Sequence, residues 1–253
     1  MLSYERRQKI SEIIRSQGMV AVDDLAARFD ISPSTIRRDL DKLAAGGDIR
    51  RTYGGALLEE NRSEEPPIIL REKEHAEAKE RIGRKAAELL KSGMTVIMDA
   101  SSTVGAMVPF LGRIDRLTVV TSGVKTAYRL NSYANIRTYC TGGLLRKHNM
   151  SLVGMGSCRI FDEINADAVF LSCRGISAEK GVTEASEEET QVKRCMMRAA
   201  ARTVLLVDSS KVGQVMMNKI CDLGRIDILI TDAELPEDWA AVCREKGVEI
   251  LYA

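Results

Sequence analysis

The sequence predicts an α/β protein in two unequal domains, a small helical domain with a β-hairpin followed by a larger domain on a mainly parallel sheet. Residues 1–58 show short amphipathic helices and turn signals, whereas from about residue 77 short apolar runs alternate with helical stretches. Between them, residues 59–75 are charged and contain Pro66-Pro67, at which a helix cannot continue. We assign residues 1–58 to the first domain, 59–75 to a linker and 76–253 to the second domain.

The composition is that of an ordinary globular protein, with 253 residues of which 45% are hydrophobic and 29% charged. No run approaches the ~18 apolar residues of a membrane span, and the amphipathic N-terminus has no apolar signal-peptide core, so we expect a cytoplasmic location. The six cysteines form no CxxC pair, and the two histidines lie far apart. We therefore expect reduced thiols, no disulfide, no metal and no cofactor.

The charge balance gives little support for a nucleic-acid partner at first sight. The chain has 37 Lys and Arg against 36 Asp and Glu, a formal net charge of +1. Residues 1–58 hold ten basic and eight acidic residues, a formal charge of +2. A DNA-binding domain this weakly basic should depend on pairing with a second copy and on contacts to base edges.

The first domain contains two helices joined by a tight turn. The first spans 23–29, and after the turn Ser32 can cap the second while Pro33 takes its first helical position. Ile36, Leu40 and Leu43 then form one apolar stripe. The opposite face carries hydroxyl and charged side chains, namely Ser34, Arg38, Asp41 and Lys42, flanked by Thr35 and Arg37. This pattern predicts a helix-turn-helix.

A β-hairpin follows the second helix and completes a winged helix-turn-helix. Gly46-Gly47 is expected to end the helix. The sequence then predicts strands at residues 49–51 and 56–58 and a turn at 53–55 between them. A helix fits the DNA major groove, where its side chains reach base edges and phosphates, and a wing can reach phosphates or the minor groove. The expected DNA-binding residues are Ser32, Ser34, Thr35, Arg37, Arg38, Lys42, Arg50, Arg51, Tyr53 and Gly54. Asp39 lies beside the apolar stripe, so we expect it to pair with an arginine of its own domain.

The alternative for this domain is a small helical interaction module whose charges are simply a solvated face. The modest charge is compatible with it. The succession of cap, stripe, turn and wing favours DNA binding.

The second domain reads as a doubly wound, mainly parallel α/β fold. The expected strands are 95–98, 117–120, 136–140, 168–172, 204–207, 226–230 and 248–251. The expected helices are 77–91, 104–111, 124–130, 187–201 and 237–246.

Small polar residues and glycines follow several of these strands. Ligands of an open parallel sheet bind beyond the carboxyl ends of its strands, and hydroxyls, backbone N–H groups and a lysine suit a phosphate. Asp99 could accept a hydrogen bond from a sugar hydroxyl. The expected effector-binding residues are Asp99, Ser101, Ser102, Thr103, Thr121, Ser122, Gly142, Gly143, Arg174 and Lys211. For any single serine or threonine the alternative is a helix cap, but several such turns on one sheet favour a shared pocket for a phosphorylated sugar.

The run SPSTIRRDLDKL followed by YGGA resembles the N-terminal signature of the DeoR family of bacterial transcription regulators, and the resemblance continues to the C-terminus. It implies a winged helix-turn-helix and an effector domain similar to sugar-phosphate isomerases, commonly in a repressor. The family's aspartate-glycine-threonine-threonine turn corresponds to Asp99–Thr103, its double glycine to Gly142-Gly143 and its lysine turn to 208–211. The chain departs from this pattern at Ala100, Ser101 and Ser122-Gly123, which bears on the identity of the effector.

The competing function is a sugar-phosphate isomerase with an accessory N-terminal domain. Isomerisation needs a base and a group that stabilises the enediolate. Residues 172–175 provide no carboxylate, and no lysine precedes a glycine run. We therefore expect a non-enzymatic, sequence-specific DNA-binding regulator, a repressor of a sugar or polyol operon, that binds double-stranded operator DNA as a homodimer or homotetramer and responds to a small phosphorylated metabolite.

Overall fold

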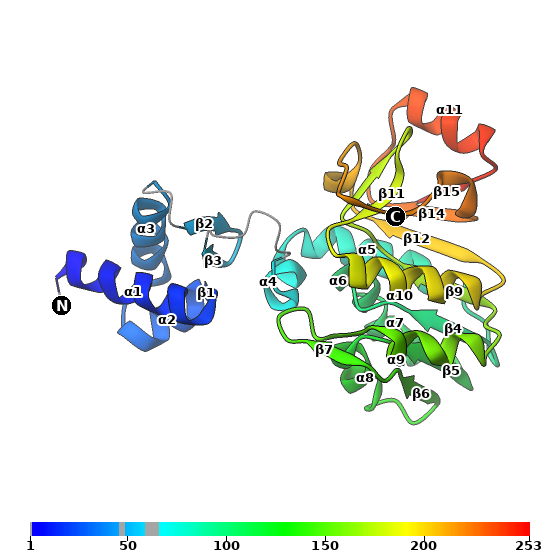
Figure 1. Ribbon diagram of the computed structural model, residues 1–253, viewed down its shortest axis with the longest axis horizontal. Coiled ribbons are helices and arrows are strands. Elements are labelled where there is room, and N and C mark those ends of the chain that lie inside the picture. Colours follow the sequence, from blue (N-terminus) through cyan, green and yellow to red (C-terminus); the bar gives the residue numbers. More distant parts are fainter. Residues whose placement is uncertain (1, 46–48, 59–65) are drawn as a thin grey trace. The chain divides into compact units, whose positions relative to one another are not determined.

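The computed structural model describes residues 2–45, 49–58 and 66–253. The chain divides into two compact units, residues 1–74 and residues 75–253 (Figure 1), and each is described by itself. Gly46 and Gly47, expected to end the second helix of the first domain, lie outside the described residues.

The first unit is a winged helix-turn-helix, as the sequence predicts. Its core is formed by ten buried side chains, among them Ile10, Ile14, Leu25, Ile36 and Leu40. The three strands form an antiparallel sheet in the order β1-β3-β2. The elements are α1 Ser3–Gln17, β1 Met19–Ala21, α2 Val22–Phe29, α3 Pro33–Ala44, β2 Ile49–Thr52, β3 Gly55–Leu58 and α4 Ile68–Lys73.

Two of these elements are absent from the sequence-based prediction. Strand β1 has only three residues, and it exists because it pairs with β3, with Val20 opposite Ala56. Helix α4 lies within the segment 59–75, for which the sequence analysis expects a linker and no helix. The prolines do not prevent this helix, because Pro67 lies at its N-cap, where a missing N–H leaves no helical hydrogen bond unmade. Leu70 is fully buried against Ala21 and Leu57.

The second unit is built on a seven-stranded sheet in which every neighbouring pair is parallel, in the order β15-β14-β12-β9-β4-β5-β6. All seven strands were predicted, each to within two residues. Their bounds are β4 Thr95–Met98, β5 Leu117–Thr121, β6 Ile136–Cys140, β9 Ala168–Leu171, β12 Thr203–Val207, β14 Ile228–Thr231 and β15 Glu249–Tyr252.

The order of the strands places a topological switch point between β4 and β9. From β4 the chain adds β5 and then β6 on one side, then returns to the other side of β4 and adds β9, β12, β14 and β15. The connections that leave β4 and β9 therefore diverge. In an open α/β sheet, the crevice where connections diverge at the carboxyl ends is the usual place for a ligand.

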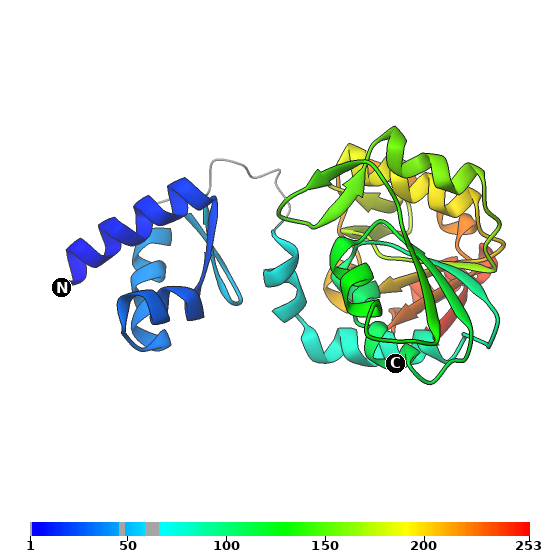
Figure 2. The same cartoon turned by 90° about the horizontal axis from the view of Figure 1, so that it is seen from below.

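Helices cover both faces of this sheet (Figure 2), which confirms the doubly wound architecture. One face is packed by α5 and α7, whose Ile82 and Leu111 are fully buried beside Phe170. The other face is packed by α10 and α11, with Met196 and Cys243 fully buried. The helices are α5 Ala76–Ala87, α6 Ser102–Gly105, α7 Val108–Leu111, α8 Val124–Leu130, α9 Met155–Cys158, α10 Glu187–Arg198 and α11 Glu237–Glu245.

The predicted helix 104–111 is divided into α6 and α7. Pro109 lies in the first turn of α7, where a proline is tolerated, whereas inside one continuous helix it would remove a hydrogen bond. The sequence-based prediction also omits a small antiparallel sheet in the order β10-β11-β13, the hairpin β7-β8 and three 3₁₀ turns. Their bounds are β7 Leu144–Arg146, β8 Ser151–Val153, β10 Gly175–Ser177, β11 Gly181–Glu184, β13 Asn218–Cys221, η1 Arg159–Asp162, η2 Ser209–Lys211 and η3 Leu223–Arg225.

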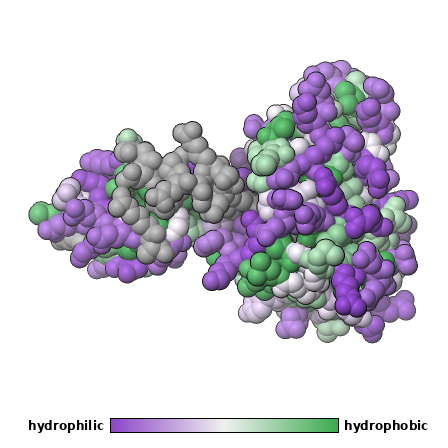
Figure 3. All heavy atoms as spheres, in the orientation of Figure 1, coloured by the Kyte–Doolittle hydropathy of each residue, from purple (hydrophilic) through white to green (hydrophobic). Residues whose placement is uncertain are grey.

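The surface of the second unit carries an apolar patch around β7, where hydrophobic side chains gather in Figure 3. Leu144 and Leu145 are 67% and 46% exposed. Met155 is 84% exposed and directly precedes Gly156, where a Cβ would lie 3.1 Å from Gly143 Cα. Within the described residues, no helix is both long and apolar enough to cross a membrane.

Candidate functional site

Helix α3 of the first unit begins as its sequence predicts. Ser32 is the N-cap, its side-chain oxygen accepts a hydrogen bond from the backbone N–H of Thr35 at 3.3 Å, and Pro33 occupies the first turn. The hydroxyls of Ser34 and Thr35 each lie 2.9 Å from the Ser32 hydroxyl. The start of α3 thus presents three linked hydroxyl groups, two of them on exposed residues, at the positive end of the helix dipole.

The basic residues expected to meet DNA lie on the surface of this unit. Arg37, Arg38 and Lys42 of α3 and Arg50 of β2 are all exposed. None of these four forms an ion pair with another residue in the described part of the chain. Tyr53, in the wing turn, is 79% exposed. These side chains are available to an external partner.

Two carboxylates of α3 are paired inside the domain. Asp39, 4% exposed, accepts a hydrogen bond from Arg6 Nε at 2.6 Å and lies 3.6 Å from Arg7 Nη1, which confirms the expectation that it pairs with an arginine of its own domain. Arg51 Nε donates to Asp41 Oδ1 at 2.8 Å, and its Nη1 donates to the carbonyl of Gly55 at 2.6 Å. Arg51 therefore ties the wing to α3, unlike its neighbour Arg50.

In the second unit, the loops after β4, β9 and β12 meet at the switch point. Asp99 is buried, and its Oδ1 accepts hydrogen bonds from the N–H and hydroxyl of Ser101 at 2.8 and 2.5 Å. Its Oδ2 accepts the N–H of Ser172 at 2.9 Å. From the loop after β12, Lys211 Nζ donates to Thr103 Oγ1 at 3.2 Å and to Ser172 Oγ at 3.4 Å. Four predicted residues, Asp99, Ser101, Thr103 and Lys211, are thus joined by Ser172, which was not predicted as a site residue.

This geometry changes the part that Asp99 can play. Its carboxylate is 1% exposed and accepts from the connections that follow both strands of the switch point, so it fixes the crevice and has little surface to offer a sugar hydroxyl. Lys211 retains 13% side-chain exposure and lies in the turn that follows β12. The ammonium group of Lys211 is the better candidate for direct contact with an anion.

A buried lysine that was not predicted lies beneath these loops. Lys193 of α10 is 5% exposed, and its Nζ lies 2.5 Å from Glu184 Oε2, 2.9 Å from the Ser172 carbonyl and 3.6 Å from Asp99 Oδ2. Lys193 therefore joins α10, β11 and the loops after β4 and β9 by charge and hydrogen bonding.

The remaining predicted residues lie in the neighbouring loops. In the loop after β5, Thr121 Oγ1 accepts the N–H of Gly123 at 3.0 Å, and Ser122 is buried. A Cβ on Gly123 would lie 3.1 Å from Ala100 Cα, so this loop adjoins the loop after β4. Gly142 and Gly143 adjoin α9 instead, since a Cβ on Gly143 would lie 3.1 Å from the Ser157 nitrogen and one on Gly142 would lie 3.5 Å from the Gly156 carbonyl oxygen. Ser102 is buried in α6, and Arg174 is half-buried after β9.

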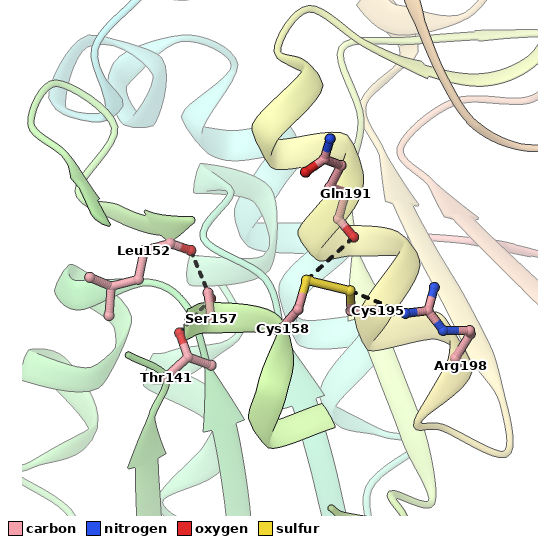
Figure 4. The surroundings of a disulfide bond; sticks show 7 residues. All are labelled: Thr141, Leu152, Ser157, Cys158, Gln191, Cys195 and Arg198. Carbon is pink, nitrogen blue, oxygen red and sulfur yellow. Dashed lines mark hydrogen bonds between the residues drawn. A yellow bond between two sulfur atoms is a disulfide. The ribbon is translucent and has the colours of Figure 1, made fainter. Parts of the chain in front are cut away.

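The structure contains a disulfide between Cys158 and Cys195 (Figure 4), so the expectation of none is wrong. The two cysteines are 37 positions apart, and the packing of α9 against α10 brings their Cα atoms to 5.6 Å. Spacing in the sequence carries no information about this packing.

The other four cysteines, Cys140, Cys173, Cys221 and Cys243, are free thiols. Burial raises the pKa of Cys173 to about 12, which makes its thiol a poor nucleophile. Among the described residues, no group of three His, Cys, Asp or Glu could hold a metal ion.

Asp208 is expected to make the stability of the larger unit depend on pH in the acid range. Burial alone would raise its pKa, but the charge of Lys211, whose Nζ lies 3.0 Å from Oδ2, and a hydrogen bond from Ser210 outweigh burial and hold the pKa below its ordinary value. Because the folded-state pKa is the lower one, Asp208 stabilises the fold above its unfolded pKa of about 3.9, and this contribution is lost as the pH falls through the folded pKa. We expect Asp208→Asn to reduce the dependence of the melting temperature on pH below about 4, as measured by calorimetry. An unchanged slope would show that the ion pair contributes nothing to the fold.

Together the two units define a DNA-binding transcriptional regulator that carries its sensor domain in the same chain. The DeoR-like helix-turn-helix domain matches residues 6–62, and the DeoR C terminal sensor domain matches residues 74–233. The chain is 35% identical to the HTH-type transcriptional regulator GolR of Listeria innocua over the full length of both chains. It is 30% identical to the glycerol-3-phosphate regulon repressor of Escherichia coli, with 99% of each chain covered. The chain belongs to the DeoR family of transcriptional regulators.

Solved structures with a related fold are more distant. Ribose 5-phosphate isomerase A of Methanocaldococcus jannaschii is similar over 55% of each chain, at 16% identity and a TM-score of 0.41. The β subunit of eIF2B from Chaetomium thermophilum is similar over 62% of this chain and 49% of its own, at 13% identity and a TM-score of 0.44.

Proposed function

We propose that this protein represses a sugar or polyol operon and that a small phosphorylated metabolite, bound at the switch point of the larger unit, controls its affinity for operator DNA. The observation that carries the proposal is the position of Lys211, whose ammonium group reaches the loops after both β4 and β9. A lysine beside hydroxyl groups at the carboxyl ends of parallel strands is suited to a phosphate. The relatives support the effector class, since one of them is named for the glycerol-3-phosphate regulon.

Binding without turnover follows from the same residues. A general base for isomerisation must reach substrate, but Asp99 and Glu184 are 1% and 2% exposed and already accept hydrogen bonds from the protein. The two relatives described above are named as a transcriptional regulator and a regulon repressor, which supports a regulatory role. We therefore assign the crevice a sensing role.

Operator binding in the cytoplasm requires two copies in this proposal. Residues 1–58 have a formal charge of only +2, so a single copy would gain little from phosphate contacts alone. A homodimer would place two α3 helices on half-sites about 34 Å, or a multiple of that distance, apart. The exposed apolar patch of Leu144, Leu145 and Met155 provides a surface through which two copies could associate.

Two alanine variants of the full-length chain separate the DNA-binding and sensing roles. Arg38→Ala should weaken binding to a duplex selected from a random-sequence library by about 5–150-fold, corresponding to ~1–3 kcal/mol for a specific base contact. It should leave unchanged the thermal shift produced by the most effective member of a panel of phosphorylated sugars and polyols. Lys211→Ala should abolish that thermal shift and preserve operator affinity.

Lys9→Ala and Lys180→Ala are the matched controls, because each removes an exposed lysine outside the two candidate surfaces. Both controls should behave as the parent protein in the two assays. Normal operator binding by Arg38→Ala, or a normal thermal shift in Lys211→Ala, would remove the corresponding residue from the proposal. Turnover of the bound metabolite would favour the isomerase function instead.

A further inference from the structure

Helix α4 packs on the sheet of the wing. Leu70 is fully buried and forms a small apolar cluster with Ala21 of β1 and Leu57 of β3. Arg71, also buried, donates from Nε to the carbonyl of Pro66 at 2.8 Å and so fixes the start of the helix. The wing sheet is therefore packed against a helix that follows it in the sequence.

The same helix also touches the wing turn and the helix-turn-helix. A Cβ on Gly54 would lie 3.4 Å from Lys73 Cδ and 3.7 Å from Leu70 Cδ2, so the turn between β2 and β3 rests on α4. Lys73 Nζ donates to Asp23 Oδ2 of α2 at 3.3 Å. Because the turn leads into both strands of the wing, a shift of α4 would change where the wing lies relative to α3.

Only Glu74 and His75 separate the end of α4 from the start of α5. His75 is the N-cap of α5 and has a left-handed backbone, with φ 52° and ψ 37°, which an L-residue adopts at some cost. Lys73 and Ala76 are three Cα steps apart, so they are separated by at most roughly 11 Å. Because only two residues intervene, the junction gives a displacement of the first turn of α5 a short covalent route to the last turn of α4.

Helix α5 in turn contacts both sides of the candidate crevice. A Cβ on Gly83 would lie 2.6 Å from the carbonyl carbon and oxygen of Ala106, so the backbone of α5 lies directly against the connection between α6 and α7. Arg81 lies 3.7 Å from Asp232 Oδ2, and Asp232 Oδ1 accepts the N–H of Ser209, in the turn that carries Lys211. Rearrangement of either loop around a ligand would act on α5.

From these contacts we propose that α4 is the positioning element of the wing, and that the α4–α5 junction transmits changes at the crevice to DNA binding. Leu70 and Lys73 are positioning residues, since they act on DNA through the wing. The transmission step rests on the proposed function, because it gives the sensing crevice its output.

The positioning role is tested without a ligand by two neighbouring alanine variants of α4. Leu70→Ala should speed amide hydrogen exchange in β1 and β3 and weaken binding to the selected operator duplex at least fivefold, while α3 keeps its protection. Ile69→Ala is the matched control, because Ile69 lies in the same helix turn and is 48% exposed, and it should match the parent. Parental exchange in β3 together with parental operator affinity in Leu70→Ala would overturn the positioning role.

Transmission is tested by a cycle of four full-length proteins, also without a ligand. In the parent background, Gly83→Ala should displace α5 and change operator affinity at least fivefold. In a second background, with Gly-Gly-Ser inserted between Glu74 and His75, the same substitution should change operator affinity less than twofold. An equal effect in both backgrounds, or none in the parent background, would overturn transmission. If Gly83→Ala fails to fold, Arg81→Ala, which removes the ion pair to Asp232, takes its place.

A control insertion of Gly-Gly-Ser between Glu179 and Lys180, in the exposed turn between β10 and β11, should leave the effect of Gly83→Ala intact. Failure of the proposed function has a different signature. In that case no phosphorylated compound would shift the melting temperature of the parent protein, while the ligand-free comparisons above would still give their answer.

Discussion

Replacement of Lys193 by methionine is expected to lower the free energy of unfolding of the larger unit by about 3–5 kcal/mol, the usual cost of removing one partner from a buried ion pair. The ammonium group lies between two carboxylates, 2.5 Å from Glu184 Oε2 and 3.6 Å from Asp99 Oδ2, and donates to the Ser172 carbonyl. Methionine has a similar length and no charge, so it would leave both carboxylates buried without their cation.

The effect should be fully expressed at neutral pH. Burial alone would lower the pKa of Lys193, but the negative charges of Glu184, Asp99 and Glu189 outweigh burial and raise the pKa above its ordinary value. A group whose pKa is higher in the folded state stabilises the fold below its unfolded pKa, about 10.4 for lysine, and this contribution is lost only as the pH rises through the folded pKa. Calorimetry of the full chain at pH 7.5 would therefore measure the whole contribution.

Lys219→Met provides the matched control, because Lys219 also pairs with a carboxylate, that of Asp222, but at an exposed site. Its unfolding midpoint should equal that of the parent protein. In the double variant Lys193→Met/Glu184→Met, one of the stranded charges is removed, so the loss should be smaller than the sum of the two single losses. Additive losses, or a Lys193→Met variant as stable as the parent, would show that the buried ion pairs contribute little to the fold.

The five inner strands of the larger unit were predictable because each is a short, mostly apolar run that is almost entirely buried, whereas the edge strands β6 and β15 are largely half-buried or exposed. Strand β6 and helix α8 have the bounds that the sequence predicts. The start of α3 was predictable for a local reason as well, since Ser32 and Pro33 determine a cap and a first turn regardless of the rest of the chain. Local signals of this kind do not depend on tertiary contacts.

What could not be predicted depends on contacts between distant segments. Strand β1 and helix α4 exist through their packing on β3, and the disulfide exists through the packing of α9 on α10. The sequence does contain one indication that Lys193 is buried. In α10 it lies one position from Val192 and three from Met196, on the apolar side of an amphipathic helix, where a lysine is rarely buried without a carboxylate partner. That position indicates a buried ion pair, although it does not identify Glu184.

Gly55→Ala is expected to disrupt the wing and, with it, specific DNA binding. A Cβ at this position would lie 1.9 Å from the carbonyl oxygen of Val20 and 3.0 Å from its carbonyl carbon. Backbone atoms cannot yield as a side chain can, so β1 would have to separate from β3, where Ala21 pairs with Gly55. Forcing extra volume into a packed site costs about 1–3 kcal/mol, and here the cost falls on one of the two pairings of a three-stranded sheet.

Gly54→Ala is the matched control for the fold, because it adds the same methyl group one residue earlier. There the Cβ would lie 3.4 Å from Lys73 Cδ and 3.7 Å from Leu70 Cδ2, both side-chain atoms in ordinary contact. Amide hydrogen exchange of β1 and β3 in the full chain should be fast in Gly55→Ala and parental in Gly54→Ala. Operator affinity should fall at least tenfold in Gly55→Ala, because Arg50 and Tyr53 would lose the sheet that holds them beside α3. Protected strands in Gly55→Ala would show that β1 can shift without loss of the wing, and the glycine would then have no steric role there.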